Sequence, residues 1–342
     1  MGEMDPDLWP HVLQTLVGHG SLSADQAADA MRAVMAGEVT PGQVGGFLMA
    51  LRTKGETVDE LDGLARAALE FANPVRAPAP VVDTCGTGGD RKGTFNISTV
   101  AAIVVAGAGV PVAKHGNRAA SGRCGSADVL EALGVRIDLD AAGVERCLAE
   151  AGIAFMFAPV FHPAFGHAGP VRRELGVPTS FNFLGPLTNP ARPAAQVVGV
   201  SDERMLPLMA EVLARRGTRA MLFRGEDGLD ELSISGPSRV LDVRDGAVRE
   251  ERLDPNVHGF VPHPGETLEG GDAATAARIA RLVLDGETGP KRDIVLLNAA
   301  AALVVAGAAV DLDEGLKTAS ASVDDGKASA TLERWAEVSN AG

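Results

Sequence analysis

Basic residues and cysteines are scarce in this sequence. Its 31 Lys and Arg against 45 Asp and Glu leave a net charge of −14. This balance disfavours a nucleic acid as the main partner, because phosphate backbones need clustered cations. The three cysteines are an odd number without metal-ligand spacing, so we expect a reduced, cytoplasmic protein. Cys85 is better interpreted as a small packed residue than as a nucleophile.

Signals for export and for membrane insertion are missing as well. The chain starts with acidic residues, whereas a signal peptide starts with basic residues and an apolar stretch. The apolar run 294–310 has 17 residues and includes Asn298, so we expect a buried helix and no membrane partner. Although there is no Tyr, 46% of the chain is apolar and 22% charged, which indicates a globular protein of one or two domains.

The first part of the chain has a helical pattern throughout. Helices are expected over 8–17, over 27–35 after a capping box at Ser23, from Pro41 and from Thr57. Three prolines within 73–80 then indicate a linker. These features predict a small all-helical N-terminal domain.

Beyond residue 80, strand patterns alternate with helical patterns. This alternation predicts a larger α/β domain with a central, mostly parallel sheet flanked by helices. Three closing helices follow, and 163–193 interrupts the alternation with a short helix over 171–175. The expected strands are 81–83, 110–114, 153–158, 196–200 and 219–223, followed by two or three short strands around 231–235, 239–243 and 248–252. The other expected helices are 99–108, 127–133, 141–151, 203–215, 273–284, 294–306 and 313–324.

A glycine-rich loop follows the first expected strand. Gly86, Gly88, Gly89 and Gly93 leave little side-chain bulk, so backbone N–H groups can approach a ligand closely. A helix is expected to begin near Ser98, and its first N–H groups attract anions. The glycine spacing fits neither a Walker loop nor a dinucleotide fingerprint. We therefore predict a site for a phosphorylated small molecule.

A second polar loop follows the next expected strand. Lys114 offers a point charge for phosphate, while Asn117, Ser121 and Ser126 offer directional hydrogen bonds. Ligands of open α/β sheets bind at this edge, outside the carboxyl ends of the strands. Alone, such a loop is more often an ordinary surface turn. Beside the glycine loop, a ligand site is the better interpretation.

Two further groups carry charge. Asp230 and Glu231 are adjacent carboxylates that repel each other unless a cation lies between them, and Mg²⁺ typically uses one or two carboxylates plus phosphate oxygens. The alternative is a solvated acidic turn. His162 and Arg172 flank a Pro- and Gly-containing segment that could bring both to one pocket, where Arg172 would recognise a carboxylate. Arg173 is assigned to a solvated helix face.

At these residues the chain resembles the anthranilate phosphoribosyltransferase family. The similarity covers nearly the whole chain, and its linked motifs are far more specific than one glycine loop. The matching segments are 47–57, 86–90, 96–99, 114–118, 162–163, 172–176, 184–190, 230–233 and 297–300.

The resemblance implies a reaction and an assembly. Phosphoribosyl pyrophosphate and anthranilate would give N-phosphoribosylanthranilate and pyrophosphate, the second step of tryptophan biosynthesis, with two Mg²⁺ ions bound with the substrate. It also implies a homodimer formed through the helical domain. That domain would comprise 1–75 joined by about 165–192, and the α/β domain would comprise 76–164 and 193–342.

The resemblance also assigns residues to each ligand. Ser98, Asp230 and Glu231 would serve Mg²⁺. Anthranilate would contact Gly86, Asn117 and Arg172, with His115 and His162 close by. Phosphoribosyl pyrophosphate would be held by Gly86, Gly89, Asp90, Thr94, Asn96, Ile97, Ser98, Thr99, Lys114, His115, Gly116, Asn117, Arg118, Ala119, Ala120, Ser121, Gly122 and Ser126.

No nucleophile–base pair stands out, and the chemistry does not require one. Breaking the C1–O bond leaves positive charge on the ribose and negative charge on pyrophosphate, which Mg²⁺ and loop amides stabilise. An aromatic amine is neutral at pH 7, so positioning and leaving-group electrostatics suffice.

Four positions depart from the common family pattern. Arg91 replaces a frequent glycine, and it could stiffen the loop or add a cation near pyrophosphate. Phe165 and Gly166 replace bulkier or polar residues near the entrance for the aromatic substrate, and Cys124 replaces a frequent Ser.

Two other functions compete with this interpretation. A pyrimidine-nucleoside phosphorylase shares the fold and uses phosphate as its nucleophile, but Asp230, Glu231 and the carboxylate site at Asn117 and Arg172 favour the transferase. A non-catalytic nucleic-acid-binding paralogue would need a basic groove, whereas this chain is acidic.

Overall fold

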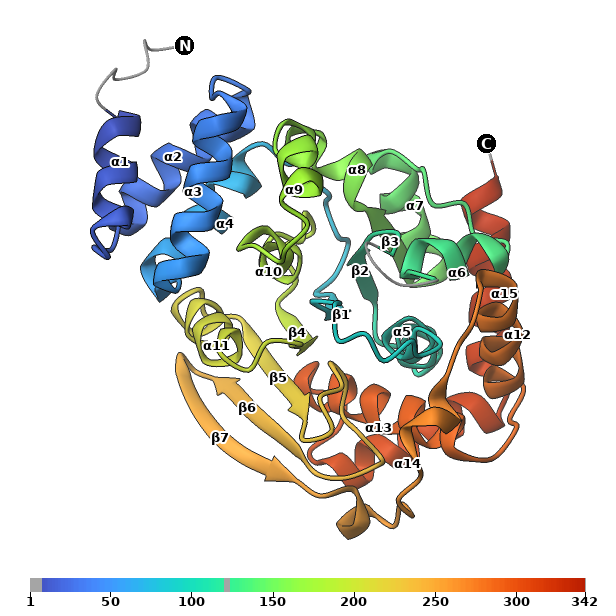
Figure 1. Cartoon of the computed structure of the whole chain (residues 1–342). Helices are drawn as coiled ribbons and strands as arrows, with labels where there is room; N and C mark the ends of the chain where they lie inside the picture. The colour runs from blue at the N-terminus through green and yellow to red at the C-terminus, as the bar shows by residue number, and fades with distance from the viewer. Residues whose placement is uncertain (1–7, 120–123, 342) are drawn as a thin grey trace.

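The computed structural model describes residues 8–119 and 124–341 and has a seven-stranded sheet in the order β3-β2-β1-β4-β5-β6-β7 (Figure 1). The strands from β3 to β5 run parallel, and β6 and β7 are antiparallel. The expected mostly parallel sheet is confirmed. The strands are β1 (Val82–Gly86), β2 (Val112–Gly116), β3 (Ile153–Phe157), β4 (Ala195–Gly199), β5 (Arg219–Gly225), β6 (Ser238–Arg244) and β7 (Ala247–Leu253).

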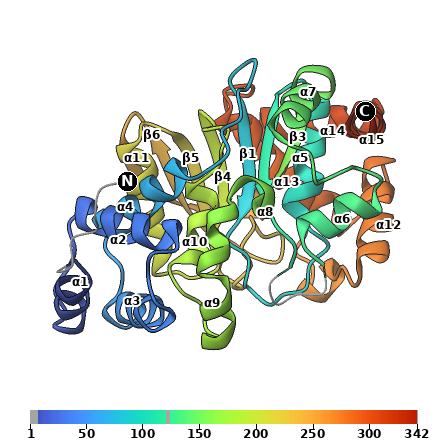
Figure 2. The ribbon, with the colours of Figure 1, turned by 90° about the horizontal axis from the view of Figure 1, so that it is seen from above.

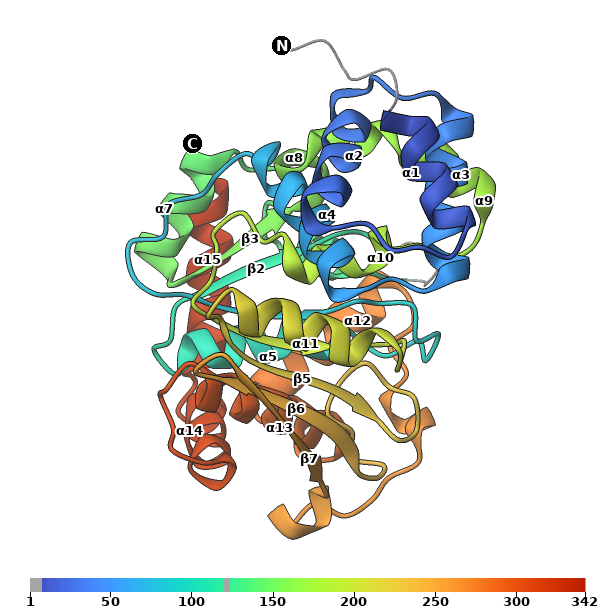
Figure 3. The same cartoon turned by 90° about the vertical axis from the view of Figure 1, so that its left-hand side faces the viewer.

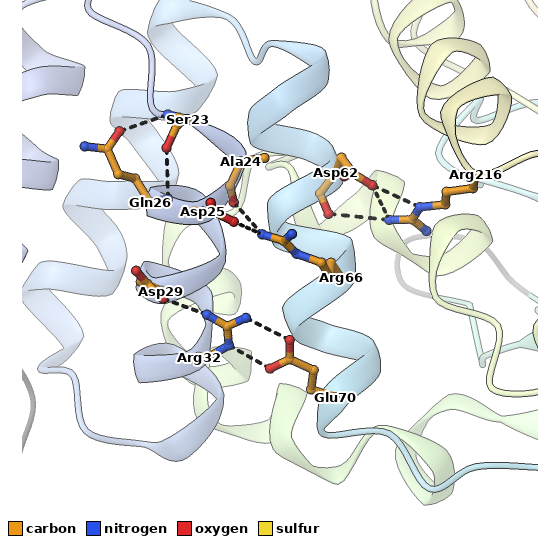
Figure 4. A network of polar contacts seen from close by, with 10 residues as sticks. All are labelled: Ser23, Ala24, Asp25, Gln26, Asp29, Arg32, Asp62, Arg66, Glu70 and Arg216. Carbon is orange, nitrogen blue, oxygen red and sulfur yellow. Dashed lines mark hydrogen bonds and ion pairs between the residues drawn. The ribbon is translucent and has the colours of Figure 1, made fainter. Parts of the chain in front are cut away.

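Four helices form the N-terminal part, as the sequence predicts: α1 (Leu8–Val17), α2 (Ala24–Ala36), α3 (Pro41–Lys54) and α4 (Val58–Glu70). Ser23, Thr40 and Thr57 each begin a helix with a complete capping box. Figure 4 shows ion pairs that join α2 to α4, among them Arg32 with Glu70 at 2.7 Å. Such exposed pairs contribute little to stability, so the buried apolar faces hold these helices together.

Helices cover both faces of the sheet (Figure 2). One apolar core joins α5, α13, α14 and α15 to the sheet. A second core is continuous from the N-terminal helices through α11 to the other face of β4 and β5. The helices that follow β1 are α5 (Ile97–Gly107), α6 (Ser126–Ala132), α7 (Ala141–Ala151), α8 (Ala158–Phe161), α9 (Gly169–Leu175), α10 (Phe181–Leu184), α11 (Met205–Arg215), α12 (Ala273–Leu284), α13 (Pro290–Val305), α14 (Leu312–Asp324) and α15 (Lys327–Asn340).

Short 3₁₀ helices complete the described chain. They are η1 (Pro163–His167), η2 (Gly185–Leu187), η3 (Pro255–His258) and η4 (Gly265–Leu268). The segment after β3 returns to the N-terminal helices, since η1 packs on α2 and α9 packs on α3. In Figure 1, α9 and α10 lie between those helices and the sheet.

Of the two or three short strands expected after β5, two form, and the number of closing helices was predicted wrongly. The strand expected over 231–235 does not form, because the side chain of Asn298 bonds both the N–H and the C=O of Leu232 in place of a neighbouring strand. A fourth closing helix, α15, follows the three that we expected, and it begins after Gly326, which has a φ of 73°. The apolar run 294–310 falls largely in the buried helix α13. Among the described helices, none is long and apolar enough to cross a membrane.

Candidate active site

A row of glycines ends the central parallel strands. Gly86 of β1 pairs with Gly199 of β4, and Gly116 ends β2. A Cβ atom on Gly199 would overlap the backbone of Asp230, and one on Gly86 would lie 2.9 Å from the Asp230 carboxylate. A Cβ atom on Gly116 would lie 2.5 Å from Ser126 Oγ. The missing side chains therefore let Asp230 and Ser126 approach this edge of the sheet.

The glycine loop after β1 is shaped by left-handed residues and is pinned on two sides. Gly88 has a φ of 66°, and the non-glycine Arg91 has a φ of 60°. Ser201, just after β4, donates from its hydroxyl to Gly88 O at 2.7 Å. At the far end, the Gly270 amide donates to Gly93 O at 2.9 Å. Segments far away in the sequence thus fix the loop.

Asp230 lies against the glycine loop, and Glu231 lies against the first turn of α5. Gly88 N donates to Asp230 Oδ2 at 2.8 Å, and Ser98 N donates to Glu231 Oε1 at 3.0 Å. Both carboxylates are nearly buried, at 9% and 7% exposure, which rejects a solvated acidic turn. Burial raises the pKa of Glu231 to about 7, and burial together with Asp90 and Glu231 raises the pKa of Asp230 well above its usual value.

This donor set fits Mg²⁺ that arrives with a phosphate ligand. No group of three or more His, Cys, Asp or Glu side chains is arranged to hold a metal among the described residues. Mg²⁺ needs six oxygen ligands and often takes only one or two carboxylates, with the rest from water and substrate phosphate. Asp90 lies close enough to Asp230 to raise its pKa. Within the described chain, the Oδ2 atom of Asp90 is buried without a hydrogen-bond partner, so it offers a further oxygen ligand.

Lys114 lies behind the carboxylates instead of in an open loop. Its side chain is buried, and its ammonium donates to Thr84 O and to Ser98 Oγ, the latter at 3.4 Å. Burial lowers the pKa of Lys114, whereas the nearby Asp83 and Glu231 raise it. The Lys114 ammonium therefore contacts Ser98 and interacts with the charge of Glu231, and its predicted contact with phosphate stays a prediction.

The rest of the second loop is held locally. Asn117 accepts at its backbone oxygen from Ser126 Oγ at 3.1 Å, and Arg118 pairs with Glu131 and Asp128. Ala119 N donates to Asp128 at 3.4 Å. The predicted site residues Ala120, Ser121 and Gly122 lie outside the described residues.

The two loops also touch. Asn96 has a φ of 65° and donates from Nδ2 to Cys124 O at 3.2 Å, directly before α5. Thr94 forms a single bridge with Glu269, and Ile97 is the buried first residue of α5, which begins two residues earlier than expected. Thr99 is buried too.

Some buried polar atoms without a hydrogen-bond partner lie on or next to these loops. Within the described chain, the buried side-chain atoms without a hydrogen-bond partner include Asp90 Oδ2, Asn96 Oδ1, Thr99 Oγ1 and His115 Nε2. An unpaired buried polar atom costs about 1–3 kcal/mol, so such atoms in a native fold call for an explanation. A polar ligand at this edge supplies one.

An aromatic wall is formed by residues from the end of β2 and from the segment 162–181. The rings of His115 and His162 are 5.0 Å apart, and Phe165 stacks on His162 at 5.0 Å. Phe181 of α10 packs against Phe165 at 5.5 Å and against the guanidinium of Arg172 at 5.2 Å. His162 and Arg172 are thus linked through Phe165 and Phe181 without a direct contact between them, and their joint pocket stays a prediction.

Charge is scarce on this wall. Burial lowers the pKa of His115 to about 3 and that of His162 to about 4, so both rings are neutral at pH 7. Their remaining contacts are to backbone oxygens, of Gly185 and Thr188. Burial also lowers the pKa of Arg172, and no carboxylate offsets this within the described chain. Arg172 is left as a cation facing neutral rings, which suits a carboxylate ligand.

Several supporting residues were missed by sequence reasoning. Ser201 pins the glycine loop, Asn298 fixes Leu232 next to Glu231, and Asn189 donates to Asp83 at 2.8 Å beneath β1. Asn189 and Asn298 stood in matched motifs without an assigned role, whereas Ser201 gave no signal. Cys85 is buried with its pKa raised by burial, as expected of a packed residue.

Comparison with known proteins decides the family. A model of the glycosyl transferase family a/b domain matches residues 78–329, and one of the family's helical bundle domain matches 10–72. An anthranilate phosphoribosyltransferase of Arthrobacter sp. (strain FB24) is 55% identical over 337 residues, covering 96% of this chain and 95% of that protein. The chain belongs to the anthranilate phosphoribosyltransferase family. It is therefore an enzyme of the phosphoribosyltransferase class, as the motifs implied.

Solved structures of this family share the fold. The anthranilate phosphoribosyltransferase of Thermus thermophilus superposes with a TM-score of 0.92 at 45% identity, covering 96% of this chain and 99% of that one. The Saccharomyces cerevisiae enzyme in complex with phosphoribosyl pyrophosphate and Mg has a TM-score of 0.90 at 28% identity, covering 99% of both chains. Another structure of the yeast enzyme contains 4-fluoroanthranilate. The predicted α/β architecture with a helical domain is confirmed.

Proposed function

We propose that this chain transfers the 5-phosphoribosyl group from phosphoribosyl pyrophosphate to the amine of anthranilate and releases pyrophosphate, in tryptophan biosynthesis. The observation that carries the proposal is the contact of two buried carboxylates, Asp230 and Glu231, with the amides of Gly88 and Ser98. Such a set of groups suits a phosphate-rich leaving group that brings its own metal.

The donor wall consists of Gly88, Ser98, Asp230 and Glu231. Its two amides hold the carboxylates, the carboxylates would hold Mg²⁺ against phosphate oxygens, and Lys114 would hold Ser98 and Glu231 in place. We assign two Mg²⁺ ions to Ser98, Asp230 and Glu231, with the remaining ligands from substrate and water. When bound, Mg²⁺ supplies positive charge that stabilises the departing pyrophosphate. Direct contacts of phosphoribosyl pyrophosphate with the predicted residues of 86–126 remain part of this proposal.

The acceptor wall consists of His115, His162, Phe165, Arg172 and Phe181. Arg172 would bind the carboxylate of anthranilate, and the flat rings would pack beside the substrate ring. Asn117 and Gly86 would contact anthranilate from the side of the strand ends.

No residue needs to act as a strong base. The amine of anthranilate is neutral at pH 7, and the two histidines are weak bases because burial lowers their pKa values to about 3 and about 4. The walls would catalyse by holding the amine against C1 of the ribose while charge develops on pyrophosphate.

Domain division and assembly are also proposed. The helical domain would comprise 1–75 with about 165–192, which is supported by the packing of α9 on α3. The α/β domain would comprise 76–164 and 193–342. We expect a homodimer formed through the helical domain, in the cytoplasm.

An assay of anthranilate fluorescence tests the function. Purified protein with Mg²⁺, phosphoribosyl pyrophosphate and anthranilate should consume anthranilate and release pyrophosphate in equal amounts. Consumption of other aromatic amines but not anthranilate would overturn the substrate assignment. Phosphorolysis of thymidine without pyrophosphate release would support the phosphorylase alternative, and Mg²⁺-independent DNA binding without turnover would support the nucleic-acid-binding one.

A further inference from the structure

Glu56 is a buried carboxylate in the turn between α3 and α4. It is 5% exposed and lies far from Asp230 and Glu231 in the sequence. Its Oε1 accepts a hydrogen bond from Ser180 Oγ at 2.8 Å, and its Oε2 accepts one from the Arg204 guanidinium at 2.6 Å. Each carboxylate oxygen of Glu56 thus accepts a hydrogen bond, one from the segment before α10 and the other from the segment before α11.

The first partner, Ser180, adjoins the acceptor wall. Ser180 is fully buried and directly precedes Phe181, the first residue of α10. The ring of Phe181 lies 5.2 Å from the guanidinium of Arg172. A shift of Ser180 would therefore move the ring that supports the acceptor's carboxylate site.

The second partner leads to the donor wall. Arg204 N donates to Asp202 Oδ1 at 3.0 Å, and Asp202 pairs with Arg52 of α3 at 2.9 Å. The preceding residue, Ser201, bonds the carbonyl of Gly88, whose amide bonds Asp230. Arg204 and Asp202 thus connect Glu56 to the segment that pins the glycine loop.

We propose that Glu56 is a positioning residue that keeps the donor and acceptor walls in register from the helical side, without touching either substrate. This inference rests on the proposed function, because the two walls are defined by its two substrates. A buried carboxylate with both oxygens bonded holds its partners firmly, since freeing any of the three leaves an unpaired buried group. Figure 3 shows α4, which follows Glu56, beside α10 and α11.

Asp59 offers a matched control at the same contact between the helical domain and α11. It also joins α4 to α11, through Arg215, but this pair is about half exposed and reaches neither wall. If Glu56 acted only by tying the helical domain to α11, neutralising Asp59 would have a similar though weaker effect on turnover.

The experiment compares Michaelis constants for the two substrates in E56Q, S180A, S201A and the control D59N. S180A should raise the constant for anthranilate alone, and S201A that for phosphoribosyl pyrophosphate alone, each by about two- to tenfold, as expected for one lost hydrogen bond. E56Q should raise both, and D59N neither. In E56Q/S180A the effects on the anthranilate constant should not add, because both changes alter the same contact between Glu56 and Ser180.

Several results would overturn the proposal. One is a folded E56Q, judged by urea unfolding, that changes one constant or neither; another is additivity in the double variant. If E56Q does not fold, S180A alone tests the proposal. Equal shifts of the two Michaelis constants in S180A would reject it, because Ser180 would then not act on the acceptor wall specifically. Wild-type enzyme is assayed first, so failure of the proposed function itself is seen as missing wild-type turnover.

Discussion

In the proposed site, the donor wall and the acceptor wall have opposite chemistry. The donor wall is polar, with buried carboxylates and backbone amides bonded to one another. The acceptor wall is aromatic, with neutral histidines and one guanidinium that lacks a carboxylate within the described chain. Charge develops on the leaving group during the reaction, so the donor wall needs groups that respond to it. The acceptor only has to be oriented, so one fixed charge among rings suffices.

The same difference appears in how each wall is supported. The donor wall depends on contacts from distant backbone, such as Ser201 to Gly88 and Asn298 to Leu232. The acceptor wall depends on ring packing through Phe165 and Phe181. Substitutions in the first should therefore alter metal use and leaving-group chemistry, and substitutions in the second should alter acceptor binding.

The largest effect is expected at Glu231. E231Q keeps the shape but removes the charge that a metal requires, so kcat should fall by roughly 100-fold or more, a size typical for losing one charge-stabilising group. The measurement is kcat as a function of Mg²⁺ concentration. E226Q is the control, because Glu226 is half exposed and pairs with Arg252 away from the walls. Unchanged Mg²⁺ dependence in E231Q would show that Glu231 does not hold metal.

Arg172 tests the acceptor wall with the next largest effect. R172A should raise the Michaelis constant for anthranilate about 10- to 100-fold, because hydrogen bonds to charged groups contribute about 1.5–3 kcal/mol. The constant for phosphoribosyl pyrophosphate should change far less. R173A, at the exposed neighbouring position, is the control. A larger rise in the Michaelis constant for phosphoribosyl pyrophosphate than in that for anthranilate would show that Arg172 does not belong to the acceptor wall.

The neutral histidines predict a pH effect on stability. His162 is buried with its pKa lowered to about 4, so between pH 6.5 and 4 a proton binds the unfolded chain but not the folded one. Its contribution is thus present above pH 6.5 and is lost as the pH falls. Between pH 7 and 5 this costs about 1–2 kcal/mol of the free energy of unfolding. In urea unfolding, H162N should lose correspondingly less stability than wild type over this range, while H11Q, at an exposed histidine, should match wild type. Parallel losses in H162N and wild type would contradict a neutral His162.

Local patterns predicted most of the fold, and they failed once where a distant contact decides and once where a local pattern was overlooked. The helix α7 was predicted to the residue, because apolar spacing and Asp140 define it locally. The apolar alternation of Leu232 and Ile234 predicted a strand, but Asn298 occupies the backbone groups that a strand would use. The helix α15 was missed, although Leu332, Trp335 and Val338 are buried at helical spacing.

The structure brings Asp230 to the glycine loop and Glu231 to Ser98, but the sequence did not predict the geometry of these contacts. Asp230, Glu231 and the glycine loop could be paired because their residue types suit a metal and a phosphate. The sequence could not tell that Lys114 points under the carboxylates, because burial of a lysine depends on neighbours such as Asp83 that fold beside it. Nor could it reveal Glu56, whose partners lie more than 100 residues away.

The smallest effect is expected at Arg91 of the glycine loop. Its substitution distinguishes two roles, strain in the loop backbone and attraction of pyrophosphate by the side-chain charge. Its φ of 60° lies in the left-handed region, which explains why glycine suits the position and argues that the side chain strains the loop. R91G should therefore raise the free energy of unfolding by about 0.5–1 kcal/mol, whereas K92G, at a neighbour without a positive φ, should lower it by a similar amount. If the Arg91 charge also attracts pyrophosphate, the Michaelis constant for phosphoribosyl pyrophosphate in R91G should rise in low salt and approach that of wild type in high salt. A less stable R91G would reject the strain, and a constant unchanged at every salt concentration would reject the charge.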